Sequence, residues 1–209
     1  MAKTMTPSAE SKAMTDGQIT KAVAVYRALL EKHAPEFDSG AVQAVLGDQG
    51  LAGEMFALFR QRVEAKANEV VRRVSGIDRA LKPADVIAMV VATGRKKYGD
   101  DKVIESMPKG EGEDAEVVFF TLGRYISDDD LEKEYEKRGL KPADAYSLAA
   151  VNRDDPAFAD EKPNCTHWKD GDGKWCYAAF RRWGVGRRVD VGRCDCGWGG
   201  DWWLAGLRK

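Results

Sequence analysis

Residues 175–196 read Trp175-Cys-Tyr-Ala-Ala-Phe-Arg-Arg-Trp183-Gly-Val-Gly-Arg-Arg-Val-Asp-Val-Gly-Arg-Cys194-Asp-Cys196 and contain the strongest indication of the fold. A Gly-Val-Gly turn between two such runs predicts a hairpin, with strands over residues 175–183 and 187–196. All six tryptophans and all four cysteines of the chain lie between Cys165 and Lys209. Tryptophan buries a large area and is rarely tolerated as random surface decoration. We therefore expect this tail to be a folded site rather than a disordered end.

The second strand of this hairpin predicts two faces of different character, because alternate residues of a strand point to opposite faces. One face carries two valines and a possible Arg–Asp pair: Val189, Val191, Arg193 and Asp195. The other face carries a cation, an anion, a glycine and two thiols: Arg188, Asp190, Gly192, Cys194 and Cys196. Glycine inside a strand costs stability and offers no packing. We expect the first face to be supported by the core and the second to be filled arbitrarily.

Helical periodicity dominates the chain before the tail. Apolar spacing predicts helices over about 16–32, 40–46, 51–74 and 83–93, after a flexible lead at 1–15. Glycine, proline and charge cluster at 107–113 and predict a linker. Beyond it we expect a buried strand at 117–122, helices at about 127–137 and 144–151, the hairpin, and a last strand at 202–207. The predicted fold class is α+β, with a helical N-terminal domain (16–106), a linker (107–114) and an α+β domain (115–209).

Composition limits the classes of function. The formal net charge of −1 gives no global basic field for binding nucleic acid or a membrane. The first residues contain no apolar stretch typical of a secretory signal, and no segment approaches the roughly 20 apolar residues that cross a bilayer. We therefore expect no membrane insertion, and a cytoplasmic or virion-associated protein. Without a secretory signal, reduced cysteine thiols are the default expectation.

Five segments carry a resemblance to a known family. They read Tyr146-Ser-Leu-Ala-Ala-Val-Asn152, Asp155-Pro-Ala-Phe-Ala-Asp160, Thr166-His-Trp-Lys-Asp170, Gly173-Lys-Trp-Cys-Tyr-Ala-Ala-Phe180 and Trp202-Trp-Leu-Ala-Gly-Leu-Arg-Lys209. In them the chain resembles the variable proteins of diversity-generating retroelements, which have relatives in archaeal viruses and small uncultivated prokaryotes. The resemblance covers about residues 116–209 well and the helical part only loosely.

The resemblance implies both a fold and a function. The fold is a C-type-lectin-like domain of the subtype shared with formylglycine-generating enzymes. The function is binding of a changeable ligand, usually a protein surface, without catalysis or a cofactor. In this family an error-prone reverse transcriptase converts template AAC codons of a C-terminal stretch into NNC codons. These codons can encode Gly, Arg, Asp, Val and Cys, but never Trp, Lys, Glu, Gln or Met.

That codon rule divides the tail into changing and constant positions. The implied ligand-binding positions are Arg181, Gly184, Gly186, Arg188, Asp190, Gly192, Cys194, Cys196, Gly199 and Asp201. The implied scaffold consists of Trp168, Trp175, Trp183, Trp198, Trp202 and Trp203. The changing set is rich in glycine and short of tyrosine, whereas rigid aromatic anchors normally supply binding energy. A weakly binding or unselected variant is therefore expected. The N-terminal helices could attach the binder to an anchoring partner or associate with one another.

A zinc site is the sharpest alternative interpretation of the tail. Its possible ligands are Cys165, His167, Cys176, Cys194 and Cys196. The spacings are C-x-H and C-x-C, however, and lack the C-x-x-C pattern of a zinc knuckle. No metal is therefore predicted.

Catalysis and nucleic-acid binding are two further alternatives. Formylglycine-generating enzymes use paired cysteines, but those of this tail fall at changing positions, and a lone His167 is more typical of a structural hydrogen bond than of a base. The acidic run Asp128–Asp130 is interpreted as a helix start rather than a cation site. Arginines near tryptophans could form a stacking surface for single-stranded nucleic acid, but three aspartates lie among them. We therefore predict no catalytic residue and expect no nucleic-acid partner.

Overall fold

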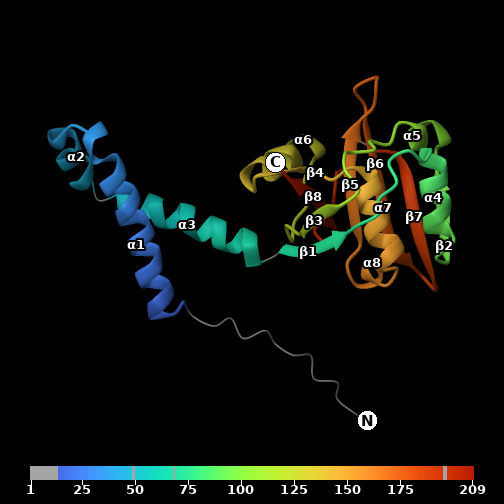
Figure 1. The fold of residues 1–209 in the computed structure, drawn as a ribbon, viewed down its shortest axis with the longest axis horizontal. Helices are drawn as coiled ribbons and strands as arrows, with labels where there is room; N and C mark the ends of the chain where they lie inside the picture. The colour runs from blue at the N-terminus through green and yellow to red at the C-terminus, as the bar shows by residue number, and fades with distance from the viewer. Residues whose placement is uncertain (1–13, 49, 68, 195–196) are drawn as a thin grey trace, which may run out of the picture. The chain divides into compact units, whose positions relative to one another are not determined.

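The computed structural model describes residues 14–48, 50–67, 69–194 and 197–209. The chain divides between Ala57 and Leu58 into two compact units. Each unit is considered by itself below, with the elements labelled as in Figure 1.

The first unit is helical, as its periodicity predicts. It contains α1 (Asp16–His33), a 3-10 turn (Ala34–Glu36), α2 (Ser39–Leu46) and the start of α3 (Leu51–Ala67). Thr15 begins α1 with a capping box, in which its hydroxyl accepts from the backbone of Gln18 and the Gln18 side chain accepts from its backbone. Asp38 caps α2 with its carboxylate, which accepts from the backbone amide of Ala41. No residue of α1 or α2 is buried.

The second unit is built on one sheet of eight strands. Its order is β1-β3-β8-β5-β6-β7-β2, with β4 paired to β8. The strands are β1 (Glu69–Val74), β2 (Arg95–Gly99), β3 (Ala115–Phe120), β4 (Leu140–Pro142), β5 (Asn164–Lys169), β6 (Trp175–Trp183), β7 (Gly186–Arg193) and β8 (Trp203–Arg208). The β2–β7 and β5–β8 pairs are parallel, and the other pairs are antiparallel.

After the C-terminal part of α3, the described residues of this unit form five further helices. They are α4 (Pro83–Val91), α5 (Asp101–Glu105), α6 (Asp128–Lys137), α7 (Ala145–Asp154) and α8 (Phe158–Glu161). Helix α7 packs against β1, β3 and β5 and lies across one face of the sheet (Figure 1), whereas α6 contacts β4. Alternate residues of β3 enter two separate cores: Val117 and Phe119 pack with α7, and Val118 and Phe120 pack with α6. The continuous apolar run of β3 therefore reflects burial on both faces.

The structure confirms the α+β class and corrects part of the element assignment. The helix expected to reach residue 74 ends at Ala67, and Glu69–Val74 forms β1, paired with β3 from Glu69↔Phe120 to Val74↔Ala115. The strands β2, β4 and β5 were also not expected. Pairing with a strand already fixed in the core overrides the helical tendency of residues 69–74.

The expected domain boundary at residues 107–114 lies inside the second unit, because β1 and β2 belong to the same sheet as the tail. This segment is tied to the loop after β1. The amide of Ile77 donates to the carbonyl of Glu113 at 2.8 Å, and Arg79 donates to the carbonyl of Gly112 at 2.9 Å. The loop 107–114 is thus held by hydrogen bonds within one sheet domain.

Candidate functional site

The site predicted from the sequence lies on the β6–β7 hairpin. The strand expected at residues 175–183 is confirmed, whereas the next strand ends at Arg193 instead of continuing to Cys196. The register places Arg181 opposite Arg188 and Gly192 opposite Tyr177. Gly184 turns the chain with a φ of 58°, a conformation that favours glycine. The candidates Asp195 and Cys196 lie outside the described residues.

The two faces of β7 differ as their residue types suggest. Val189 and Val191 are fully buried in the core that contains α7. On the other face, Arg188 is half-buried and Asp190 is only 5 % exposed. Asp190 is thus not freely exposed to solvent. It forms a polar cluster with Arg181 and Arg188.

A cavity of about 180 Å³ opens on this second face. Its lining consists of Asp128, Cys176, Tyr177, Ala179, Arg181, Asp190, Cys194, Gly197, Trp198 and Trp202. Three of the candidate changing positions are therefore brought together: Arg181, Asp190 and Cys194. The other described candidates lie beside the cavity or in the turns and do not line it: Gly184, Gly186, Arg188, Gly192, Gly199 and Asp201.

The charges in this cavity are close but incompletely hydrogen-bonded. The Asp190 carboxylate accepts from Nε of Arg188 at 2.5 Å, and its other oxygen lies 3.3 Å from Nε of Arg181. The second contact is not aligned as a hydrogen bond: within the described part of the chain, Arg181 Nε and Asp190 Oδ2 are buried without a hydrogen-bond partner. Buried polar atoms usually have such partners. This cluster can therefore accept additional polar contacts from a ligand.

Aromatic rings border the charged cluster. The Arg181 guanidinium lies 4.6 Å from the ring centroid of Trp183 and 5.8 Å from that of Trp202, within cation–π range. Arg188 lies 3.8 Å from the ring centroid of Tyr98 on β2. Tyr98 was not predicted as a site residue, since only the parallel pairing of β2 with β7 brings it there.

The six tryptophans do not all act as scaffold. Trp168 and Trp198 are buried, and half-buried Trp202 and Trp203 pack against the two cores. Trp183 is 64 % exposed because it pairs with Gly186 at the last step of the hairpin, beyond the cores. Trp183 is therefore an exception to the scaffold role expected for the tryptophans, because its ring is exposed outside both cores.

Asp128 connects this face to a buried histidine. Its Oδ1 accepts from the indole Nε1 of Trp198 at 3.0 Å and lies 2.7 Å from Nδ1 of His167. The other ring nitrogen of His167 lies 2.8 Å from Oε1 of Glu132, and the ring stacks on Trp175 with centroids 4.5 Å apart. Ser127 caps α6, so the predicted helix start at the acidic run is confirmed. The contact between Asp128 and Trp198 could not be predicted from the sequence pattern, because the two residues are far apart along the chain.

The environment of His167 favours its protonated form. Burial lowers the pKa of His167, but the hydrogen bond to Asp128 and the contact with Glu132 outweigh burial, so its pKa is raised above the usual 6.5. Both ring nitrogens lie near carboxylates, but only Nδ1 is hydrogen-bonded. The contact of Nε2 with Glu132 is not aligned as a hydrogen bond, so within the described residues Nε2 is buried without a hydrogen-bond partner.

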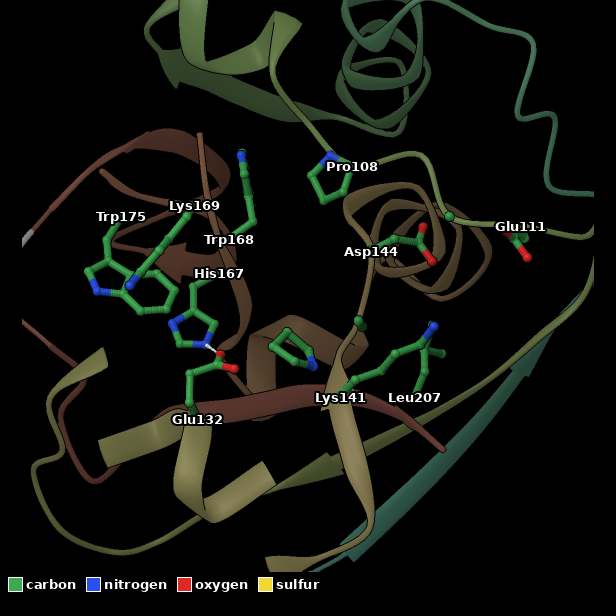
Figure 2. A pocket seen from close by; sticks show the side chains of 13 residues that line it. Pro108, Glu111, Glu132, Lys141, Asp144, His167, Trp168, Lys169, Trp175 and Leu207 are labelled. Atoms are coloured by element: carbon green, nitrogen blue, oxygen red, sulfur yellow. Dashed lines mark ion pairs between the residues drawn. The ribbon is translucent and has the colours of Figure 1, made fainter. Parts of the chain in front are cut away.

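His167 also lines a larger cavity of about 750 Å³, shown in Figure 2. The cavity forms because β5 pairs with β8 only at Asn164 and Cys165 and then separates from it. Figure 2 shows His167 and Trp175 on one side, with Glu132 below the imidazole. Asp144 lies on the opposite side of the cavity. Its carboxylate pairs with Arg79, which lies in the loop between β1 and α4.

The cysteines that the structure describes differ in burial and in bonding state. Cys165 and Cys176 are free thiols, and burial raises the pKa of both, that of Cys165 to well above its usual value. Cys194 is half-buried and disulfide-bonded, which corrects the expectation of a reduced thiol at that position. Among the residues that the structure describes, no three His, Cys, Asp or Glu side chains are placed to hold a metal ion.

Comparisons of the chain with protein-family models, curated proteins and solved structures found no match. Within the described ranges, no helix has both the length and the apolar character required to span a bilayer.

Proposed function

We propose that the chain is a diversified ligand-binding protein of the kind encoded by diversity-generating retroelements. In this proposal the second unit is a C-type-lectin-like variable domain that binds changing protein targets without catalysis. The observation that carries it is the composition of the 180 Å³ cavity. Arg181, Asp190 and Cys194, all accessible to NNC codons, meet there against Trp198 and Trp202, which such codons cannot produce.

The difference between the fixed and the changeable residues of the cavity wall supports the proposal. Trp198 is buried and bonded to Asp128, so the constant part of the wall is fixed by packing and by a hydrogen bond. On β7, the face opposite the cavity is held in the core by Val189 and Val191. The side chains on the cavity face can therefore change while the strand stays in register.

A protein surface is the ligand class that this face suits best. Trp183 and Tyr98 are 64 % and 47 % exposed, and each lies against an arginine. Tryptophan, tyrosine and arginine are the residues enriched at the energetic centres of protein interfaces. Aromatic anchors thus come from constant or neighbouring positions, which offsets the lack of tyrosine among the changing ones.

Single-stranded nucleic acid is less favoured, because the arginines of the hairpin are already paired with aspartates. Arg182 and Arg187 contact Asp160 at 3.3 and 2.9 Å, and Arg193 contacts Asp170 at 2.6 Å. Arg181 and Arg188 share Asp190, as described above. A phosphate backbone would have to compete with these carboxylates for each guanidinium.

The test of the proposed function is genomic. Near the coding sequence there should be a near-copy of the codons for about residues 180–203, differing only where the copy has adenine, beside a reverse transcriptase gene. Sequencing of related isolates should then show substitutions at Arg181 and Asp190 but not at Trp198. A locus without such a copy, or with substitutions spread evenly over all codons, would contradict the proposal.

A further inference from the structure

We propose that the 180 Å³ cavity beside the β6–β7 hairpin is a recognition pocket for a single carboxamide side chain, that of a glutamine or asparagine of a partner protein. The inference deepens the proposed function and rests on it for the class of partner. It goes beyond that function by naming the chemical group that this variant of the cavity recognises.

Two buried polar atoms at the cavity are the first observation. Nε of Arg181 is a hydrogen-bond donor, and Oδ2 of Asp190 is an acceptor. They lie 3.3 Å apart but are not aligned with each other, and neither has a hydrogen-bond partner among the described residues. The Asp190 side chain is only 8 % exposed. A ligand that supplies one acceptor and one donor side by side would satisfy both atoms.

The charges of this cluster select a neutral ligand. Two guanidinium groups, those of Arg181 and Arg188, share the single carboxylate of Asp190. A cationic side chain would be repelled by the two guanidinium groups. A carboxylate could accept from Arg181, but it has no donor for Asp190 and would place a second negative charge against it. A neutral group that both donates and accepts avoids both costs.

Geometry then separates a side-chain carboxamide from a main-chain peptide group. Asparagine and glutamine carry a C=O acceptor and an NH₂ donor on the same carbon, so both can point to one side. In a trans peptide group the C=O and the N–H point in opposite directions. Only the side-chain amide can therefore reach Arg181 Nε and Asp190 Oδ2 together.

The cavity has the size and the walls for one side chain. Its volume of about 180 Å³ is below the roughly 300–1,000 Å³ of sites for drug-sized ligands. The Trp198 ring meets those of Tyr177 and Trp202 edge-on, with centroids 5.8 and 5.5 Å apart, and these three rings can pack against the methylene stem of a glutamine. The Arg181 side chain is 27 % exposed, so its rotation can open the two buried atoms to an entering group.

The test is a titration of the full chain with three capped amino acids of similar length, the N-acetyl methylamides of glutamine, glutamate and lysine. Two-dimensional NMR follows Nε–H of Arg181 and the indole Nε1–H of Trp198 and Trp202. The glutamine probe should bind with a dissociation constant on the order of 1 mM, as expected for so small a ligand. The other two probes should bind at least roughly tenfold more weakly, because each leaves a buried polar atom unpaired.

Two variants assign the preference to the cavity. Arg181→Met removes the donor, keeps an apolar stem and should abolish the preference for glutamine. Arg182→Met is the matched control, because Arg182 is the next residue of the same strand, is 49 % exposed and pairs with Asp160 instead of lining the cavity. It should keep the wild-type preference. The amide spectrum of each variant shows whether the sheet domain is still folded.

Equal binding of the three probes to the wild type, or binding of none, would overturn the proposal. A preference that persists in Arg181→Met, or one that both variants lose, would overturn it as well. Adenosine offers the same donor and acceptor pair on the edge of its base, and tighter binding of adenosine than of glutamine would contradict a protein ligand. The genomic test separates the two proposals: a locus with the template copy but no preference for glutamine would support the proposed function and overturn the carboxamide pocket alone.

Discussion

At the scale of single residues, two tryptophans of the same tail differ completely in their surroundings. Trp198 is buried, donates to Asp128 and packs edge-to-face on Trp202 with centroids 5.5 Å apart. Trp183 is largely exposed at the end of the hairpin. Burial and hydrogen bonding, rather than residue type, therefore decide which tryptophan holds the fold.

We expect Trp198→Ala to lower the free energy of unfolding by about 3–5 kcal/mol, the usual cost of removing a large buried aromatic ring. Trp183→Ala should change it by no more than about 0.5 kcal/mol, because little packing is lost at an exposed site. Urea denaturation followed by circular dichroism measures both values. Equal losses in the two variants would show that burial does not distinguish them.

The pH dependence of stability should carry a contribution from His167. Its pKa is raised in the folded state, so the stabilisation is fully present below the unfolded value of about 6.5 and is lost as the pH rises through the folded pKa. His167→Gln should therefore destabilise the protein more at pH 6 than at pH 9. His33→Gln, which removes the other histidine of the chain, serves as the control. A constant difference between His167→Gln and the wild type at all pH values would contradict this expectation.

At the scale of elements, Arg79 fixes the loop 107–114 to helix α7. Its guanidinium pairs with Asp144, which caps α7, and donates to Ser147 Oγ at 2.9 Å and to the carbonyl of Gly112 at 2.9 Å. Its side chain is only 15 % exposed. Arg79 lies in the predicted N-terminal domain, and α7 lies in the predicted C-terminal domain, so this one residue joins two parts of the chain that the sequence suggested would be separated by a linker.

We expect Arg79→Ala to destabilise the second unit by about 2–4 kcal/mol, since it leaves the buried carboxylate of Asp144 without its charge partner. Arg73→Ala removes a surface arginine whose side chain is 83 % exposed and paired with Glu116, and should cost less than about 1 kcal/mol. Hydrogen exchange should also show faster exchange at 109–113 in Arg79→Ala alone. Unchanged exchange there would mean that the loop is held by other contacts.

Elements with clear periodicity could be predicted from the sequence, and those that depend on pairing could not. Strand β6 combines aromatic and small residues between two turns, and its predicted limits are confirmed. Strand β2 reads Arg-Lys-Lys-Tyr-Gly, which lacks an apolar pattern because it is an edge strand; charged residues at edges prevent pairing with other chains. The clustering at Asp190 was missed for the same reason, since Arg188 and Tyr98 meet only through the β2–β7 register.

At the scale of the whole molecule, the sheet sets the limits of the folding unit. Strands β1 and β2 form its two edges, and β1 pairs with β3, which in turn pairs with β8. A fragment of residues 107–209 lacks both edge strands and α4, whose Val86, Ile87 and Val90 belong to the larger core. It therefore lacks part of the core itself, not merely a flanking domain.

We predict that a fragment of residues 58–209 folds on its own, whereas one of residues 107–209 does not. The first should give a cooperative thermal transition and dispersed amide signals in NMR spectra. The second should expose apolar surface and lack a cooperative transition. A cooperative transition in the shorter fragment would place the domain boundary at residues 107–114 after all.

Under the proposed function, the contact between Asp128 and Trp198 affects how many of the diversified variants can fold. A gene segment that is rewritten at random normally yields mostly misfolded products. Here the backbone of Trp198 is bonded in both directions to Ile126, and its indole is anchored to a carboxylate on α6, far from the rewritten codons in sequence. Under the proposed function, many side chains near Trp198 can therefore be substituted while most of the resulting variants still fold.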